Sequence, residues 1–149
     1  MHFGDAAGQD VRGGVQHLKG QSRKVGVTGF VSGGALTLLS AVNVPEADEA
    51  VVWHGFPPLE YVDATKIKAP LLGHYAIEDV PFPIATVDLL EQKLRAANVR
   101  FEFHRADVSF RNKEARVSFD PARVTVEQMI EAVGRAGFHA SLKATKPTK

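Results

Sequence analysis

The stretch that decides the fold is KVGVTGFVSGGALTLLSAV, residues 24–42. Its first part, residues 24–30, has the β-rich composition of a short strand, and residues 33–42 carry apolar side chains at the spacing of one helix face. Glycines at 29, 33 and 34 lie between the two runs. The order of strand, tight turn and helix predicts an α/β protein.

The turn between the two runs has the spacing of a nucleophile elbow, in which small residues flank a sharp bend that lifts one side chain above the sheet. In the frame Gly29-x-Val31-x-Gly33 the raised residue is Val31. Valine has no nucleophilic atom, and a β-branched residue at the positive φ of such a bend costs about 1–2 kcal/mol. The turn is therefore either strained or relaxed, and we expect no covalent hydrolase chemistry from it.

The neighbouring segments extend this α/β pattern. Residues 50–54 and 70–75 are unbroken apolar runs, which are typical of strands covered on both faces, as in parallel sheets. Residues 83–98 place apolar side chains on one stripe, and residues 6–19 show a weaker stripe, so we expect a helix in each. The sequence predicts a mixed, mostly parallel sheet with residues 55–69 as a loop.

After position 100 the pattern changes from buried runs to alternation. Residues 101–110 and 114–119 alternate apolar and polar side chains around a short polar connection, which predicts a β-hairpin with one wet face. Thr125 and Gln128 have the spacing of a capping box at the start of an amphipathic helix. Residues 139–143 are the expected last strand.

Composition excludes several functional classes. The chain has 149 residues, and 18 Lys and Arg against 17 Asp and Glu leave no net field to attract nucleic acid or acidic membranes. Cysteine is absent from the sequence, which excludes disulfides, thiolate metal sites and thiol catalysis. We find no signal-like start and no apolar run of ~20 residues, so the expectation is a soluble, cytoplasmic protein without nucleic-acid or membrane partners.

Three stretches resemble the C-terminal part of a bacterial dienelactone hydrolase. They are residues 24–42 above, AVVWHGFPPLEYVDATKIKAPLLGHY (50–75) and PFPIATVDLLEQKLRAANVRFEFHR (81–105). The resemblance spans about residues 3–105. It implies an α/β-hydrolase fold with a cysteine at the elbow, an aspartate after a later strand and a histidine near the chain end.

On this sequence the cysteine position holds Val31, and the resemblance assigns the acidic position to Asp79. The family's histidine segment is expected just after residue 105, where the chain departs from the family pattern. We therefore expect no catalytic residues: Val31, Ser32 and Asp79 are vestigial positions. The alternative is catalysis by Ser32 with His74 or His104 as base; the usual role of a residue after an elbow is to supply its backbone N–H to an oxyanion hole.

Residues 107–143, DVSFRNKEARVSFDPARVTVEQMIEAVGRAGFHASLK, resemble the second half of a heavy-metal-associated domain. That resemblance implies a ferredoxin-like fold with a C-x-x-C metal motif, and the matching loop here, residues 76–82, has no cysteine. The pair Glu78 and Asp79 is too sparse for a hard cation. The histidines have no i, i+4 pairing; they are His2, His17, His54, His74, His104 and His139. We expect no metal and no cofactor.

Taken together, these patterns predict how the chain is assembled and what role it has. The chain is expected to be an engineered or recombined chimera: a hydrolase-like fragment (1–105), a ferredoxin-like hairpin, helix and strand packed with it (106–143), and a disordered tail (144–149). Its predicted role is a non-enzymatic scaffold without either parental activity. The alternative is a weak esterase or small-ligand binding module using the pocket around Val31, Ser32, Trp53 and Asp79. The last strand is expected to pair at an outer edge of the sheet, to displace another strand, or to pair with a second chain. The third case would give a homo-oligomer, because an open sheet edge invites pairing.

Overall fold

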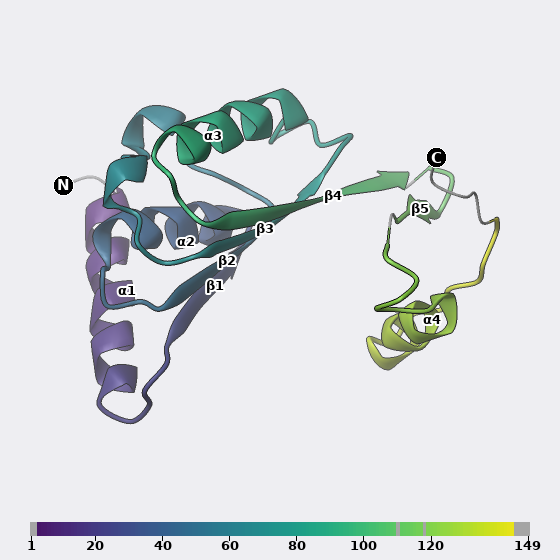
Figure 1. Ribbon diagram of the computed structural model, residues 1–149, viewed down its shortest axis with the longest axis horizontal. Helices are drawn as coiled ribbons and strands as arrows, with labels where there is room; N and C mark the ends of the chain where they lie inside the picture. Colours follow the sequence, from purple (N-terminus) through teal and green to yellow (C-terminus); the bar gives the residue numbers. More distant parts are fainter. Residues whose placement is uncertain (1–2, 110, 118, 145–149) are drawn as a thin grey trace. The chain divides into compact units, whose positions relative to one another are not determined.

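The computed structural model describes residues 3–109, 111–117 and 119–144 (Figure 1). The chain divides into two compact units, Met1–Ala115 and Arg116–Lys149. The expected disordered tail lies outside the described residues, apart from residue 144. Among the described residues, none of the helices has the length and apolar character needed to cross a membrane.

The first unit is built on a sheet with the order β1-β2-β3-β4-β5. Its parallel strands are β1 (Gly26–Phe30), β2 (Glu49–Trp53), β3 (Leu71–Ala76) and β4 (Phe101–Ser109), and the short β5 (Glu114–Arg116) follows β4 at the edge. The strands predicted up to residue 119 are confirmed, with bounds that differ by at most two residues in the parallel set and with a shorter β5. Phe110 and Ser118 of the predicted hairpin lie outside the described residues.

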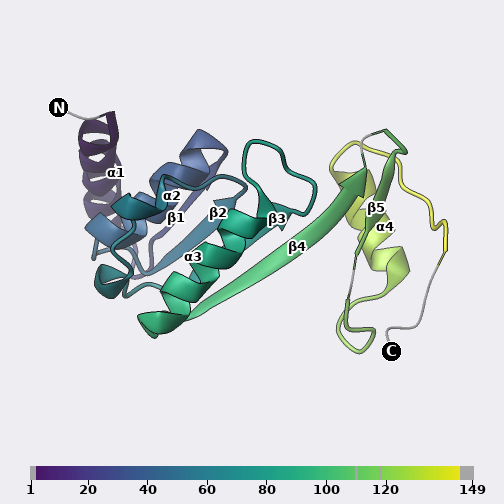
Figure 2. The same ribbon diagram turned by 90° about the horizontal axis from the view of Figure 1, so that it is seen from above.

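Helices cover one face of this sheet (Figure 2). They are α2 (Ser32–Asn43) and α3 (Ile84–Ala96), and two 3-10 turns, η1 (Leu59–Tyr61) and η2 (Ala64–Lys66), lie in the loop after β2. Leu38 of α2 and Leu90 of α3 belong to the same core as the buried strand residues. The mixed α/β fold is therefore established.

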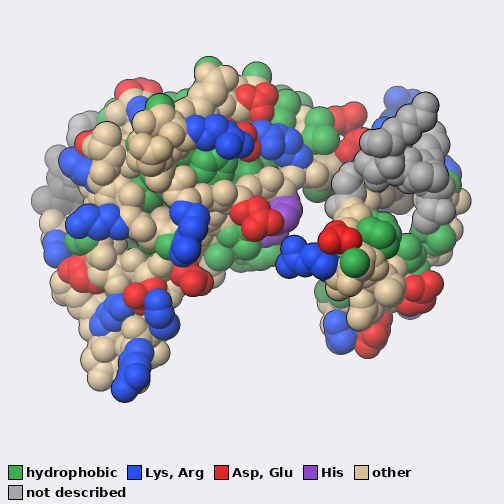
Figure 3. All heavy atoms as spheres, viewed as in Figure 1, with side chains coloured by type: hydrophobic (Ala, Val, Ile, Leu, Met, Phe, Trp, Pro, Cys, Tyr) green, Lys and Arg blue, Asp and Glu red, His purple; other side chains and the backbone are tan. Residues whose placement is uncertain are grey.

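Helix α1 (Phe3–Lys19) packs on α2 through a smaller core. That core consists of Val15, Val25, Val44 and Ala47. At its rim, Nη2 of Arg12 donates to Oε1 of Glu46 at 2.7 Å. Basic and acidic side chains are interspersed over the face of this unit seen in Figure 3.

The opposite face of the sheet carries exposed side chains. Phe30 of β1 is 65% exposed, and Trp53 of β2, which lies in one of the two apolar runs, is 38% exposed. The prediction that the apolar runs are covered on both faces is therefore wrong in the first unit, because its helices all pack on one side.

The second unit contains α4 (Val126–Arg135), whose predicted start is confirmed. Thr125 accepts the backbone N–H of Gln128, and the Gln128 side chain accepts the N–H of Thr125. Residues 139–143 form no strand, so the predicted last strand and ferredoxin-like arrangement are wrong. The physical reason is that β3, the required neighbour of that strand, already pairs with β2 on one side and β4 on the other.

Candidate functional site

The elbow between β1 and α2 is retained, with valine at its apex. Val31 has φ 55° and ψ −111°, a left-handed conformation that L-residues with a branched Cβ disfavour. Its N–H donates to the carbonyl of His54 at 2.9 Å, and its carbonyl accepts the N–H of Ala35 at 3.1 Å. Of the two alternatives left open by the sequence, the strained turn is the one observed.

Close backbone approaches hold the elbow in this shape. A Cβ at Gly29 would overlap the carbonyl of Gly33, and a Cβ at Gly34 would overlap the carbonyl of His54. Gly55, at φ 103°, lies against the carbonyl of Val31 in the same way. Gly33 itself has open space around its Cα, so the contacts that require glycine come from Gly29, Gly34 and Gly55 rather than from the Gly33 position of the frame.

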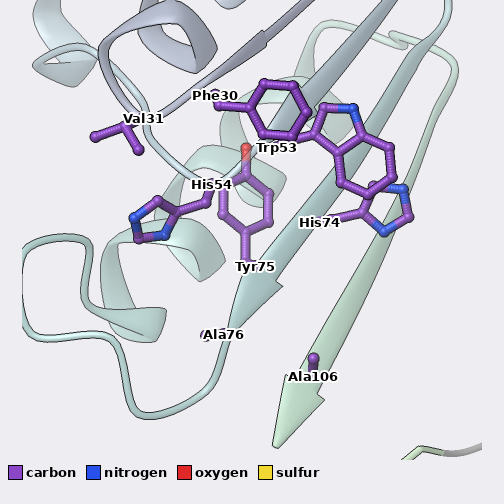
Figure 4. A pocket seen from close by; sticks show the side chains of 8 residues that line it. All are labelled: Phe30, Val31, Trp53, His54, His74, Tyr75, Ala76 and Ala106. Carbon is purple, nitrogen blue, oxygen red and sulfur yellow. The ribbon is translucent and has the colours of Figure 1, made fainter. Parts of the chain in front are cut away.

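A pocket of about 290 Å³ opens at the carboxyl ends of the strands, beside the elbow (Figure 4). Aromatic and small apolar side chains make up most of its wall. It is lined by Phe30, Val31, Trp53, His54, His74, Tyr75, Ala76 and Ala106. Trp53, expected to be core or pocket wall, is part of the wall. Strand ends of parallel sheets are where α/β proteins bind ligands.

One wall of the pocket belongs to a row of stacked rings across four strands. Ring centroids lie 5.6 Å apart for Phe30 and Trp53, 4.2 Å for Trp53 and His74, and 5.2 Å for His74 and His104. The strand register places these residues opposite one another. Burial lowers the pKa of His74, and the neighbouring His104 lowers it further.

On the other side of the pocket, His54 is paired with Asp79. His54 follows β2 at φ 58°, and Asp79 lies in the loop after β3. Nδ1 of His54 meets Oδ2 of Asp79, whose side chain is only 5% exposed. The other carboxylate oxygen accepts the N–H of Phe82 at 3.0 Å, and the Phe82 ring stands edge-on to the imidazole with 4.9 Å between centroids.

The sequence-predicted positions therefore separate into two groups. Val31 and Asp79 both lie at the elbow site, linked through His54. Ser32 is exposed at the first turn of α2, while His74 and His104, its proposed bases, lie in the stacked row. Sequence reasoning missed His54, whose signal was a histidine at the carboxyl end of a buried strand, directly before a glycine.

No group of three or more metal-ligating side chains that could hold an ion occurs among the described residues. The histidines are nevertheless less scattered than the sequence suggested, since His54 and His74 line one pocket and His104 stacks on His74. The first backbone N–H groups of α2 face no capping side chain in the described structure. Such groups stabilise negative charge on a ligand.

The chain matches a known protein family over most of its length. The model of the "Dienelactone hydrolase family" matches residues 4–135. A "Putative carboxymethylenebutenolidase" of Salmonella typhi is 37% identical over 92 residues, covering 56% of this chain and 34% of the relative. A protein of the same name from Methylorubrum extorquens is 35% identical over 94 residues, covering 57% and 32%. The chain thus spans about a third of the length of these curated relatives.

Solved structures of hydrolases are similar to the chain in fold. A "Putative Dienelactone Hydrolase from Klebsiella pneumoniae" superposes with a TM-score of 0.50 at 31% identity, covering 74% of this chain and 49% of that one. The α/β hydrolase MGS-M1, from a deep-sea metagenome, gives a TM-score of 0.57 at 20% identity, covering 68% and 48%, and supports the fold alone.

These findings correct the functional prediction. The family match runs through residue 106 and includes α4, so the expected chimera of two families, engineered or de novo, is wrong. The prediction of an inactive, non-enzymatic scaffold, which was drawn from the missing nucleophile and the missing histidine segment, is also wrong, because the matching family and the relatives of this chain carry the names of hydrolases. With the elbow, the aspartate position and the sheet in place, the chain belongs to the dienelactone hydrolase family.

Proposed function

We propose that the chain hydrolyses small esters, with single-ring lactones of the carboxymethylenebutenolide class as the first candidates. The observation that carries the proposal is the elbow: Val31 keeps the positive φ of a hydrolase elbow and forms the wall of a pocket beside the start of α2. The names of the curated relatives supply the substrate class.

The pocket suits a small, flat substrate. Its volume of about 290 Å³ is near the lower end of the range for small-molecule sites, roughly 300–1,000 Å³. Trp53 and Phe30 offer flat apolar surface to a conjugated ring, and His54 and His74 supply polar atoms. We expect substrates with one ring and a short side chain to fit better than long-chain esters.

The start of α2 supplies a site for the charge that develops during ester hydrolysis. Attack on an ester carbonyl places negative charge on its oxygen, and preorganised N–H donors stabilise that oxyanion. The N–H groups of Ser32 and Gly33 lie in the uncapped first turn directly after Val31. In this proposal Ser32 acts through its backbone.

The test is hydrolysis of a five-membered enol lactone and of an activated aryl acetate by the purified chain. We expect saturable turnover that falls when the pocket is filled by Ala106→Trp, because Ala106 lines it. The matched control is Ala96→Trp, at the exposed end of α3. Absence of turnover in the parent, or equal rates in both tryptophan variants, would contradict the proposal.

A further inference from the structure

We infer that His54, held by Asp79, is the general base that activates water for direct attack on the ester carbonyl. This inference rests on the proposed ester hydrolysis and assigns its chemistry. It replaces a covalent route, since the side chain at the apex of the elbow is the unreactive isopropyl group of Val31.

The first support is the way Asp79 holds the imidazole. Its carboxylate is nearly fully buried and is fixed by the N–H of Phe82, so it presents one oxygen to Nδ1 of His54. A carboxylate on Nδ1 keeps the proton there and leaves Nε2 as the basic nitrogen. Phe82 packs edge-on against the ring and restricts its rotation.

The second support is the backbone link between His54 and the elbow. The carbonyl of His54 accepts the N–H of Val31 at 2.9 Å, and Gly55 lies against the carbonyl of Val31. His54 itself has the left-handed φ of 58°, which directs the chain sharply out of β2. Figure 4 shows the imidazole beside the Val31 side chain, and both line the pocket.

The reaction balances with the ester and one water molecule. Nε2 of His54 takes a proton from water while the water oxygen forms a bond to the carbonyl carbon, and the carbonyl electron pair moves onto its oxygen near Ser32 and Gly33. When the tetrahedral species collapses, the ester C–O bond breaks and the leaving oxygen takes the proton from the imidazolium. A simple ester releases an acid and an alcohol, a lactone opens to one product that carries both the carboxylic acid and the enol, and His54 is neutral again.

His74 lines the same pocket but is placed differently. Its ring is stacked between Trp53 and His104, at 4.2 and 5.2 Å, and burial lowers its pKa. A ring fixed in such a stack presents its face to its neighbours. We therefore assign the proton transfer to His54 and the shape of the wall to His74.

The experiment compares the whole chain with His54→Gln, His54→Ala, Asp79→Asn and Asp79→Glu. We expect His54→Gln to lower kcat by roughly 10²-fold or more, as loss of a general base does, with little change in KM. Added imidazole should restore part of the activity of His54→Ala.

Asp79 is a positioning residue, so Asp79→Asn should lower kcat with KM unchanged, and Asp79→Glu should recover part of that loss. The control is His17→Gln, on α1, where the ring contacts Gln21 outside the pocket.

The outcomes separate the two proposals. If the parent shows no turnover, the proposed function is wrong and the catalytic role of His54 falls with it. If the parent is active and His54→Gln, folded by circular dichroism, is equally active, only the inference is wrong. An acylated protein trapped in mass spectra during turnover, and lost in Ser32→Ala, would also overturn the inference by showing a covalent route.

Discussion

Val31 lies at φ 55° although nothing in its own side chain favours that conformation. A β-branched residue there costs about 1–2 kcal/mol, so the surrounding backbone must impose the bend. The carbonyl of His54, the N–H of Ala35 and the contact with Gly55 are the constraints observed. At the residue scale, the conformation of Val31 is therefore imposed by the residues around it and not by its own side chain.

Gly55 offers a direct test of this view. A Cβ at this position would meet the carbonyl of Val31, and the φ of 103° is itself unfavourable for alanine. We expect Gly55→Ala to lower the free energy of unfolding by about 2–4 kcal/mol, measured by urea denaturation. The matched control is Gly14→Ala in α1, where a Cβ meets nothing within 4 Å, and which should raise stability by up to about 1 kcal/mol. Equal effects of the two substitutions would show that the elbow is not held by this contact.

At the scale of elements, an ion pair fastens α1 to the segment after α2. Hydrogen bonds from Arg12 and Gln16 lower the pKa of Glu46 to about 2. Because this pKa is depressed in the folded state, the stabilisation is present above about pH 4.5 and is lost as the pH falls toward 2. We expect the urea midpoint of Glu46→Gln to lie below that of the parent at pH 7 and to approach it at pH 3. Glu60→Gln, on the exposed face of η1, is the control. If the urea midpoints of the parent and of Glu46→Gln differ by the same amount at pH 7 and pH 3, the prediction is wrong.

The stacked row across the strands predicts a second pH effect. Burial and the nearby His104 lower the pKa of His74, while Glu102 opposes that shift. The unfolded chain binds this proton more readily, so His74 reduces stability as the pH falls below about 6.5. Trp53, the sole tryptophan, stacks on His74 at 4.2 Å, so its fluorescence should report the titration. We expect His104→Gln to move the midpoint of this fluorescence titration to higher pH, because the substitution removes the positive charge beside His74. An unchanged titration midpoint would show that the two imidazoles do not interact.

The elements were predictable from local patterns, whereas the site depended on contacts distant in sequence. Helix α3 and the capping box of α4 follow from periodicity and capping residues, which act within a few positions. The pairing of His54 with Asp79 joins residues on different strand ends, and no local pattern specifies it. The prediction of a strand at 139–143 was wrong for the same reason, because the place of that strand depended on which edges of β3 were free.

At the scale of the whole molecule, the first unit is asymmetric. Its helices cover one face of the sheet, and the other face exposes Phe30, Trp53 and His104. Parallel sheets are ordinarily covered on both faces, and the chain spans about a third of the length of its curated relatives. Exposed aromatic surface of this kind raises the tendency to associate.

The outer strand β1 is where we predict self-association. It lies at one end of the strand order, and an unpaired parallel strand presents N–H and carbonyl groups to another chain. We expect sedimentation to show a concentration-dependent dimer that Gly26→Lys dissociates, since a lysine on an edge strand opposes pairing. The substitution is sterically acceptable, because a Cβ at Gly26 makes only ordinary contact with Glu49, at 3.6 Å.

Gln92→Lys, on the exposed side of α3, should leave the dimer intact. A parent that stays monomeric at about 100 μM would contradict a dimer with a Kd below that concentration. A dimer equally stable in Gly26→Lys would show that β1 is not the contact.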